Sequence, residues 1–200
     1  MIRPLPLLSL LAGLLTAAPA LAQTVPAAHR PALLRAGLGS CLNGTGDYAV
    51  LKTYLEYAPQ FGQHWRLGSR LAYLSGNQPY DFGRGYSVPQ QYQALNAEQE
   101  VYWLPFGANK VVEFSLGGGG FAGYGRQQSF TRAGIDFETQ RFYYLPQNER
   151  GLHAGYLASA TLDFALSASR TWRLGTKVSV QNDTRGTVLP GGQVQLSRAW

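Results

Sequence analysis

The sequence is poor in cysteine, methionine and charge. Among its 200 residues there is one Cys and one Met, and charged residues make up 14%. A single cysteine excludes an internal disulfide framework. Low charge together with 12% aromatic residues is unlike a disordered chain, which needs high charge and few aromatic residues. The chain is therefore expected to fold, and its length suits one domain.

Long hydrophobic runs are also scarce. The one clearly apolar stretch, Leu5–Leu15, is shorter than the roughly 20 residues that a membrane-spanning helix needs. It follows Arg3 and precedes Ala20-Leu21-Ala22, which together are typical of a secretory signal and its cleavage site. We predict a signal peptide over residues 1–22, a short N-terminal segment over 23–32 and the mature domain over 33–200. Any membrane span of the exported protein must then be made of strands.

The residues needed for a nucleic-acid, metal or cofactor site are few or are scattered along the sequence. The net charge is +6, but Lys and Arg form no run or stripe, which argues against nucleic-acid binding and fits a weak attraction to acidic lipid headgroups. Three His and one Cys do not have the spacing of a metal site, and no motif indicates a cofactor. Leu38-Gly39-Ser40-Cys41 resembles a lipoprotein box, but its distance from the apolar signal favours a small residue in a first strand.

High glycine content, 24 residues, and 12 Tyr disfavour helices and suit short strands. Several segments alternate apolar with polar residues, as strands between lipid and a polar lumen do. We predict eight such strands, an even number that lets an antiparallel meander close into an up-and-down transmembrane β-barrel. The predicted segments are Leu33–Leu42, Tyr48–Tyr57, His64–Ser75, Gln91–Leu104, Val111–Tyr124, Leu152–Leu166, Trp172–Gln181 and Gln193–Trp200.

The charged residues of these strands share one face. Because an arginine facing lipid near the midplane costs about 2–4 kcal/mol, that face must be the lumen. The lumen row contains five acids and five bases, which we expect to pair and to plug a narrow barrel. Its members are Lys52, Glu56, Arg66, Arg70, Glu98, Glu100, Glu113, Asp163, Arg173 and Lys177. Gln99 is a polar misfit on the lipid-facing side.

The aromatic residues are also predicted to lie at one level along the barrel axis. All four Trp, with Tyr57, fall at the end that carries the short connections, as an aromatic girdle at a membrane interface would. The predicted girdle is Tyr57, Trp65, Trp103, Trp172 and Trp200. Tyr73, Phe121 and Tyr124 could form an opposite girdle. At that opposite end three long loops are expected, over residues 76–90, 125–150 and 182–192.

The long loops are where a specific function would lie. Residues 76–90 and 125–150 interleave aromatic residues with Arg, including Tyr80, Phe82, Phe130, Arg132 and Phe142. This composition suits binding of proteins or glycans, and it equally suits a rigid β-rich extension of the barrel.

These residues resemble the small outer-membrane β-barrel proteins of Gram-negative bacteria, namely the porin-like OmpA/OmpX group of eight strands and the compact barrels of Bacteroidetes. The resemblance is carried by the signal-like start, the hairpins around Trp65 and Trp172, the segment Val112–Tyr124 and the terminal aromatic residue. Phe114–Tyr124 also resembles TraO, a barrel protein of conjugative transposons. The resemblance implies a monomeric outer-membrane barrel, inserted by the barrel-assembly machinery, with outer-membrane lipid around it and a structural or surface-interaction role.

Two alternatives remain open from the sequence. A soluble periplasmic, lipocalin-like barrel that binds a small apolar ligand would need the apolar rows to point inward. A lipid-modifying barrel enzyme would need a nucleophile beside a base. His153, Ser159 and Asp163 share one strand face, but His153 and Ser159 are six residues, about 20 Å, apart along a strand. We therefore expect no enzyme activity.

Overall fold

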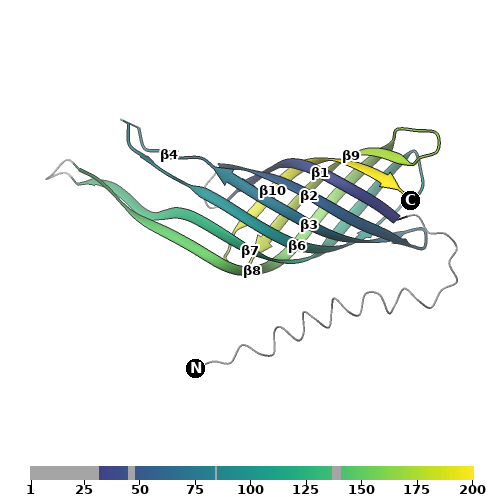
Figure 1. The fold of residues 1–200 in the computed structure, drawn as a ribbon, viewed down its shortest axis with the longest axis horizontal. Coiled ribbons are helices and arrows are strands. Elements are labelled where there is room, and N and C mark those ends of the chain that lie inside the picture. Colours follow the sequence, from purple (N-terminus) through teal and green to yellow (C-terminus); the bar gives the residue numbers. More distant parts are fainter. Residues whose placement is uncertain (1–31, 45–47, 84, 137–140) are drawn as a thin grey trace, which may run out of the picture. The chain divides into compact units, whose positions relative to one another are not determined.

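The computed structural model describes residues 32–44, 48–83, 85–136 and 141–200, all within the unit Pro31–Trp200. The predicted signal peptide and N-terminal segment lie outside the described residues. The described residues form ten strands, most of which are labelled in Figure 1. They are β1 (Ala32–Asn43), β2 (Tyr48–Phe61), β3 (Trp65–Asn77), β4 (Tyr80–Asp81), β5 (Ser87–Val88), β6 (Gln91–Trp103), β7 (Val112–Asp136), β8 (Arg141–Ala165), β9 (Trp172–Asp183) and β10 (Val188–Ala199). Among the described residues, no helix is long and apolar enough to cross a membrane.

Eight of the strands form one closed antiparallel barrel, in the order β1-β10-β9-β8-β7-β6-β3-β2. Each long strand pairs with its neighbours along the chain, and pairing of β1 with β10 closes the ring, with Leu33 opposite Ala199. Closure leaves no free edge within the ring. The predicted fold class, an all-β barrel of eight antiparallel strands, is confirmed. The short strands β4 and β5 pair only with each other.

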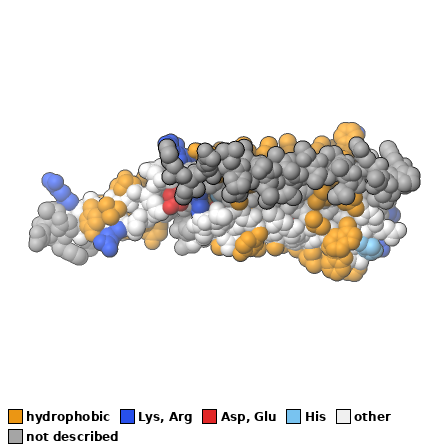
Figure 2. All heavy atoms as spheres, turned by 90° about the horizontal axis from the view of Figure 1, so that it is seen from below, with side chains coloured by type: hydrophobic (Ala, Val, Ile, Leu, Met, Phe, Trp, Pro, Cys, Tyr) orange, Lys and Arg blue, Asp and Glu red, His pale blue; other side chains and the backbone are white. Residues whose placement is uncertain are grey.

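The barrel is apolar outside and charged inside. Along β3 the exposed and buried residues alternate, so that Leu71 is 56% exposed whereas Arg70 is 5% exposed. Leu55 and Val178, on other strands, are 63% and 60% exposed. Figure 2 shows groups of hydrophobic side chains on the face of the barrel in view, gathered most densely at its right-hand end. This arrangement is the opposite of the inward-facing apolar rows that a lipocalin-like barrel requires.

Two of the predicted long loops are wrong. Residues 125–136 and 141–150 continue as β7 and β8, whose ladder pairs Arg126 with Arg150 and extends to Asp136 with Arg141. Figure 1 shows this pair of strands projecting well beyond the barrel, at the end away from the C-terminus. Periodicity missed the extension because its residues do not alternate regularly between apolar and polar side chains.

The predicted loop over residues 182–192 is also much shorter in the structure. β9 continues to Asp183 and β10 begins at Val188. Pro190 and its two following glycines look like loop residues, yet all three lie in the ladder. Gly191 is needed there because a methyl group would run into Cys41, with 2.5 Å to its Sγ. Cys41 itself is a buried residue near the C-terminal end of β1.

Candidate functional site

All ten predicted lumen charges lie inside the barrel. Each is at most 5% exposed, and each makes at least one ion pair with another buried charge. The strands place them there because successive side chains of a strand alternate between the two faces of the sheet.

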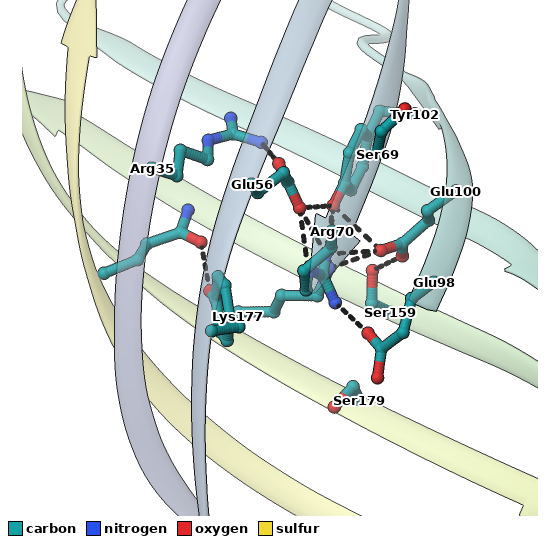
Figure 3. A network of polar contacts seen from close by, with 12 residues as sticks. Arg35, Glu56, Ser69, Arg70, Glu98, Glu100, Tyr102, Ser159, Lys177 and Ser179 are labelled. Carbon is teal, nitrogen blue, oxygen red and sulfur yellow. Dashed lines mark hydrogen bonds and ion pairs between the residues drawn. The ribbon is translucent and has the colours of Figure 1, made fainter. Parts of the chain in front are cut away.

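Arg70 lies at the centre of this network (Figure 3). Its guanidinium contacts Glu56, lies 2.7 Å from Glu98 Oε2 and 2.8 Å from Glu100 Oε2. The guanidinium also makes a cation–π contact with the ring of Tyr54, with 4.6 Å between the guanidinium carbon and the ring centroid. One cation therefore joins three carboxylates from two strands.

Tyr102 connects the same carboxylates to a second cation. Its hydroxyl donates to Glu56 Oε2 at 2.7 Å, while Lys177 Nζ lies 2.8 Å from the hydroxyl and 2.5 Å from Glu100 Oε2. Lys52 forms a separate arm, with 2.7 Å from its Nζ to Glu98 Oε1. Tyr102 was not predicted as a network member, although its inward position follows from the same alternation.

Glu113 holds another part of the network near the end with the short connections. Its two carboxylate oxygens lie 3.2 Å from Arg66 Nη2 and 3.0 Å from Arg173 Nη2. Among the described residues these are the ion pairs that Arg66 and Arg173 make. One carboxylate thus serves two buried guanidinium groups.

Arg35 is the charged residue that the sequence prediction missed. It is 1% exposed and bridges Glu56 Oε1 at 2.8 Å and Asp163 Oδ2 at 2.9 Å. With it, the buried ion-pair network contains six bases and five acids. The signal was available, since Arg35 lies between Leu34 and Ala36 and so takes the inward position of the alternation.

Glycines on neighbouring strands make room for these large side chains. A methyl group at position 117 would run into Glu100 and Ser159, whereas one at position 118, on the outer face, meets nothing within 4 Å. Glycine is therefore needed at position 117 because of the bulk of the network.

The side chains considered for catalysis are placed apart. His153 contacts Asp183 Oδ2 at 3.0 Å and Asn96 Oδ1 at 2.9 Å, whereas Ser159 donates to Glu100. Asp163 pairs with Arg35. Each of the three therefore has a different partner, and a nucleophile–base contact between Ser159 and His153 is not formed. Within the described residues, no group of three or more His, Cys, Asp or Glu side chains is suited to a metal ion.

The five predicted girdle residues are all exposed on the exterior, between 43% and 64%. Trp65 lies directly opposite Trp103 in the β3–β6 ladder. Arg198, which interrupts the apolar row of β10, lies over the rings of Trp172 and Trp200, at 5.5 and 4.8 Å from their centroids. Its charge is thus placed among amphipathic rings rather than bare hydrocarbon.

Two other outer-face predictions have different outcomes. Phe121, predicted for the opposite girdle, is wrong: it is 7% exposed and packs edge-on against the His153 ring inside the barrel, with 5.6 Å between centroids. The polar misfit Gln99 is paired, because its Oε1 accepts a hydrogen bond from Ser69 Oγ at 3.0 Å. Pairing reduces the cost of two polar groups on the apolar exterior.

An aromatic cluster joins the β4–β5 segment to the projecting strands. Phe82 contacts Phe130 and Phe142, with centroids 5.3 and 5.5 Å apart. Tyr86 stacks on Phe142 at 5.0 Å, and Tyr80 lies 5.6 Å from Phe130. We call two parts of the chain together the outer extension. They are the β4–β5 segment, and residues 129–136 of β7 with residues 141–147 of β8, which lie beyond the pairing of β7 with β6.

No protein-family model and no curated protein sequence matches this chain. Solved structures do match. The chain is similar to the attachment invasion locus protein Ail of Yersinia pestis in complex with the heparin analogue sucrose octasulfate, with a TM-score of 0.53 and 10% identity over 86% of this chain and 98% of that one. A second Ail structure gives a TM-score of 0.51 at 10% identity, with the same coverage of 86% and 98%.

The architecture is a closed eight-stranded antiparallel β-barrel, the fold that the chain shares with Ail. The N-terminal β-barrel domain of Pseudomonas aeruginosa OprF also aligns, at a TM-score of 0.41 and 11% identity over 84% of this chain and 97% of that domain. Identities this low concern the fold, so what the barrel does must be argued from its own side chains.

Proposed function

We propose that this chain is a non-enzymatic outer-membrane barrel with a plugged lumen, acting at the cell surface through its outer extension. The observation that carries the proposal is the inverted placement of side chains, with Leu55, Leu71 and Val178 exposed and Arg70 and Lys177 buried. An exterior of this kind would be a large apolar patch in water, which soluble monomers rarely tolerate. Hydrocarbon is the solvent that suits it.

Location is tested by fractionation of cells that express the full chain. We expect the protein in the outer-membrane fraction, released only by detergent. Recovery with the soluble periplasm would contradict the proposal and would favour a soluble ligand-binding barrel. Export by the predicted signal peptide, and insertion by the barrel-assembly machinery through the last strand and Trp200, are parts of this proposal.

The plugged lumen is supported by the size of the barrel and by the network within it. Eight strands enclose a space about wide enough for side chains alone, and here Arg70, Tyr102 and Lys177 reach the same group of carboxylates. Planar-bilayer recordings should therefore show no stable channel. A steady ohmic conductance of the purified barrel would exclude a plug.

The surface role is supported by the outer extension. Tyr143 and Tyr144 are 46% and 41% exposed, and Arg132 and Arg141 are exposed on the same pair of strands. Tyr and Arg are residue types that dominate recognition surfaces. The similar structure of Ail holds a heparin analogue, which makes sulfated glycans the first ligands to test here. The resemblance to TraO gains no support from the comparisons and carries no part of the proposal.

Ligand binding is tested by titrating sucrose octasulfate and a panel of host glycans and proteins against the barrel in detergent. A matched variant replaces residues 129–147 with a short turn and leaves the barrel strands intact. We expect binding by the full chain and its loss in the variant. Equal binding by both would place any recognition outside the outer extension.

An enzymatic role has no geometric support, because Ser159 and His153 have separate partners. Replacing Ser159 with Ala should leave the lipid composition of the outer membrane unchanged. An altered acyl-chain pattern in that variant would contradict the non-enzymatic assignment.

A further inference from the structure

The exterior of β6, β7 and β8 changes character abruptly towards the outer extension. Leu95, Tyr124 and Leu152 lie opposite one another in the ladder and are 51%, 55% and 81% exposed. They form the last apolar row of this side of the barrel. In the proposed orientation, the hydrocarbon of the outer leaflet ends at this row.

The next row on the same face is basic. Arg126 and Arg150 face each other directly across the β7–β8 ladder, with Gln93 beside Arg126 on β6. Both arginines are exposed, and in the described part of the chain neither forms an ion pair with a carboxylate. Like charges directly opposite each other destabilise a sheet. An anion from outside the chain, bound between the two arginines, would relieve this repulsion.

A third guanidinium lies nearby, but on the other face. Arg185, in the turn between β9 and β10, donates from Nη2 to the carbonyl oxygen of Leu152 at 3.4 Å. The same Nη2 would be 3.4 Å from a methyl group at Gly151, and Gly151 faces the opposite side of β8 from Arg150. Arg185 therefore lies towards the lumen, and the cations at the upper border of the apolar surface are Arg126 and Arg150.

The nearby acids are already engaged. Asp183 Oδ1 accepts from the backbone N–H groups of Arg185 and Thr187, each at 2.9 Å, and its Oδ2 contacts His153. Glu149 Oε1 accepts from Gln147 Nε2 at 2.6 Å, and its ladder partner is Gln127. Successive residues face opposite sides of a strand, so Glu149 does not share the face of Arg150.

We propose that Arg126 and Arg150 bind a phosphate monoester on the headgroup of an outer-leaflet lipid. Two guanidinium forks fit a doubly charged, three-oxygen group better than a singly charged diester. Their height, one ladder row beyond the apolar surface, is where headgroups lie. The inference rests on the proposed membrane location and assigns a lipid partner to a surface distinct from the aromatic cluster.

The test uses the full chain refolded into nanodiscs of phosphatidylcholine. A minority of the lipid is phosphatidic acid, a monoester, or in parallel phosphatidylglycerol, a diester. Native mass spectrometry then counts the lipids that the released barrel retains at low ionic strength. We expect preferential retention of phosphatidic acid, reduced about fivefold by each of Arg126→Gln and Arg150→Gln. Arg132→Gln, an equal charge change further along β7, should leave retention unchanged.

Three results would overturn the inference while leaving the membrane assignment intact. One is equal retention of the two lipids by the inserted wild-type barrel. Another is an equal loss in Arg132→Gln, which would indicate general charge attraction. The third is displacement of phosphatidic acid by equimolar inorganic phosphate, which would indicate a free-anion site. Failure of the refolded barrel to enter any bilayer would instead contradict the proposed function, and the inference with it.

Discussion

Glu113 should be the most costly carboxylate of the lumen to neutralise. Its replacement by Gln keeps the shape but removes the single negative charge that faces Arg66 at 3.2 Å and Arg173 at 3.0 Å. Removing one partner of a buried pair costs about 3–5 kcal/mol, because the remaining charge stays uncompensated. Since both cations lose their carboxylate partner, we expect Glu113→Gln to lower the free energy of unfolding by about 3–5 kcal/mol.

Glu56 provides the matched comparison. It has more partners than Glu113, but they are redundant, because Arg35 keeps Asp163 and Arg70 keeps Glu98 and Glu100. Glu56→Gln therefore leaves no cation without a carboxylate partner. It should lower the free energy of unfolding by only about 1.5–3 kcal/mol, the value of a hydrogen bond to a charged group. The order of the two variants thus follows the number of cations left without a carboxylate and not the number of hydrogen bonds lost.

The assay is equilibrium urea unfolding in lipid vesicles, followed by tryptophan fluorescence and by the heat-modified mobility of the folded barrel on gels. Adding Arg173→Met to Glu113→Gln removes one of the two cations that have lost their carboxylate partner, and it should recover part of the lost stability. The reasoning is refuted if Glu56→Gln costs as much as Glu113→Gln, or if the double variant is less stable than Glu113→Gln alone.

Three further changes test other parts of the barrel. Gly117→Ala should destabilise it by about 1–3 kcal/mol, because the methyl group overpacks the lumen, while Gly118→Ala, with nothing within 4 Å, should be neutral in the same unfolding assay. Arg198→Gln removes a cation lying over two tryptophan rings and should cost about 1 kcal/mol, together with a shift of the tryptophan emission. Phe142→Ala removes contacts with three other rings and should expose residues 129–147 to limited proteolysis without changing the unfolding midpoint of the barrel.

The alternation of residue types was enough to predict the barrel and the direction of its side chains. It works wherever one face of a strand meets hydrocarbon, because a one-residue shift would turn every charge towards lipid. It fails for the outer extension, which in the proposed orientation meets water on both faces, and so these residues are predicted as a loop. Phe121 was misplaced because the glycines before it hide the alternation of β7.

The partners of individual charges could not be predicted in the same way. Arg35 and Asp163 are 128 residues apart, and Lys52 and Gln181 are 129 apart. Such contacts cross the lumen, so they depend on the closure and radius of the barrel rather than on any local pattern. The sequence therefore predicts which charges lie inside, whereas their pairing needs the three-dimensional structure.

The high glycine content is tied to the same network. Gly37 lies opposite Tyr54 and Gly175 lies opposite Asp163 in their ladders, and at each of these glycines an added methyl group would run into that partner's side chain. Gly68 lies opposite Glu100, and a methyl group added to it would be 2.7 Å from a ring carbon of Tyr102. A narrow barrel can hold large polar groups only if neighbouring strands give up side-chain volume at the same level. Glycine at these inward positions therefore gives the charged side chains the space to pair. Replacing such a glycine with a larger residue should disrupt the pairing of the charges before it disrupts the pairing of the strands.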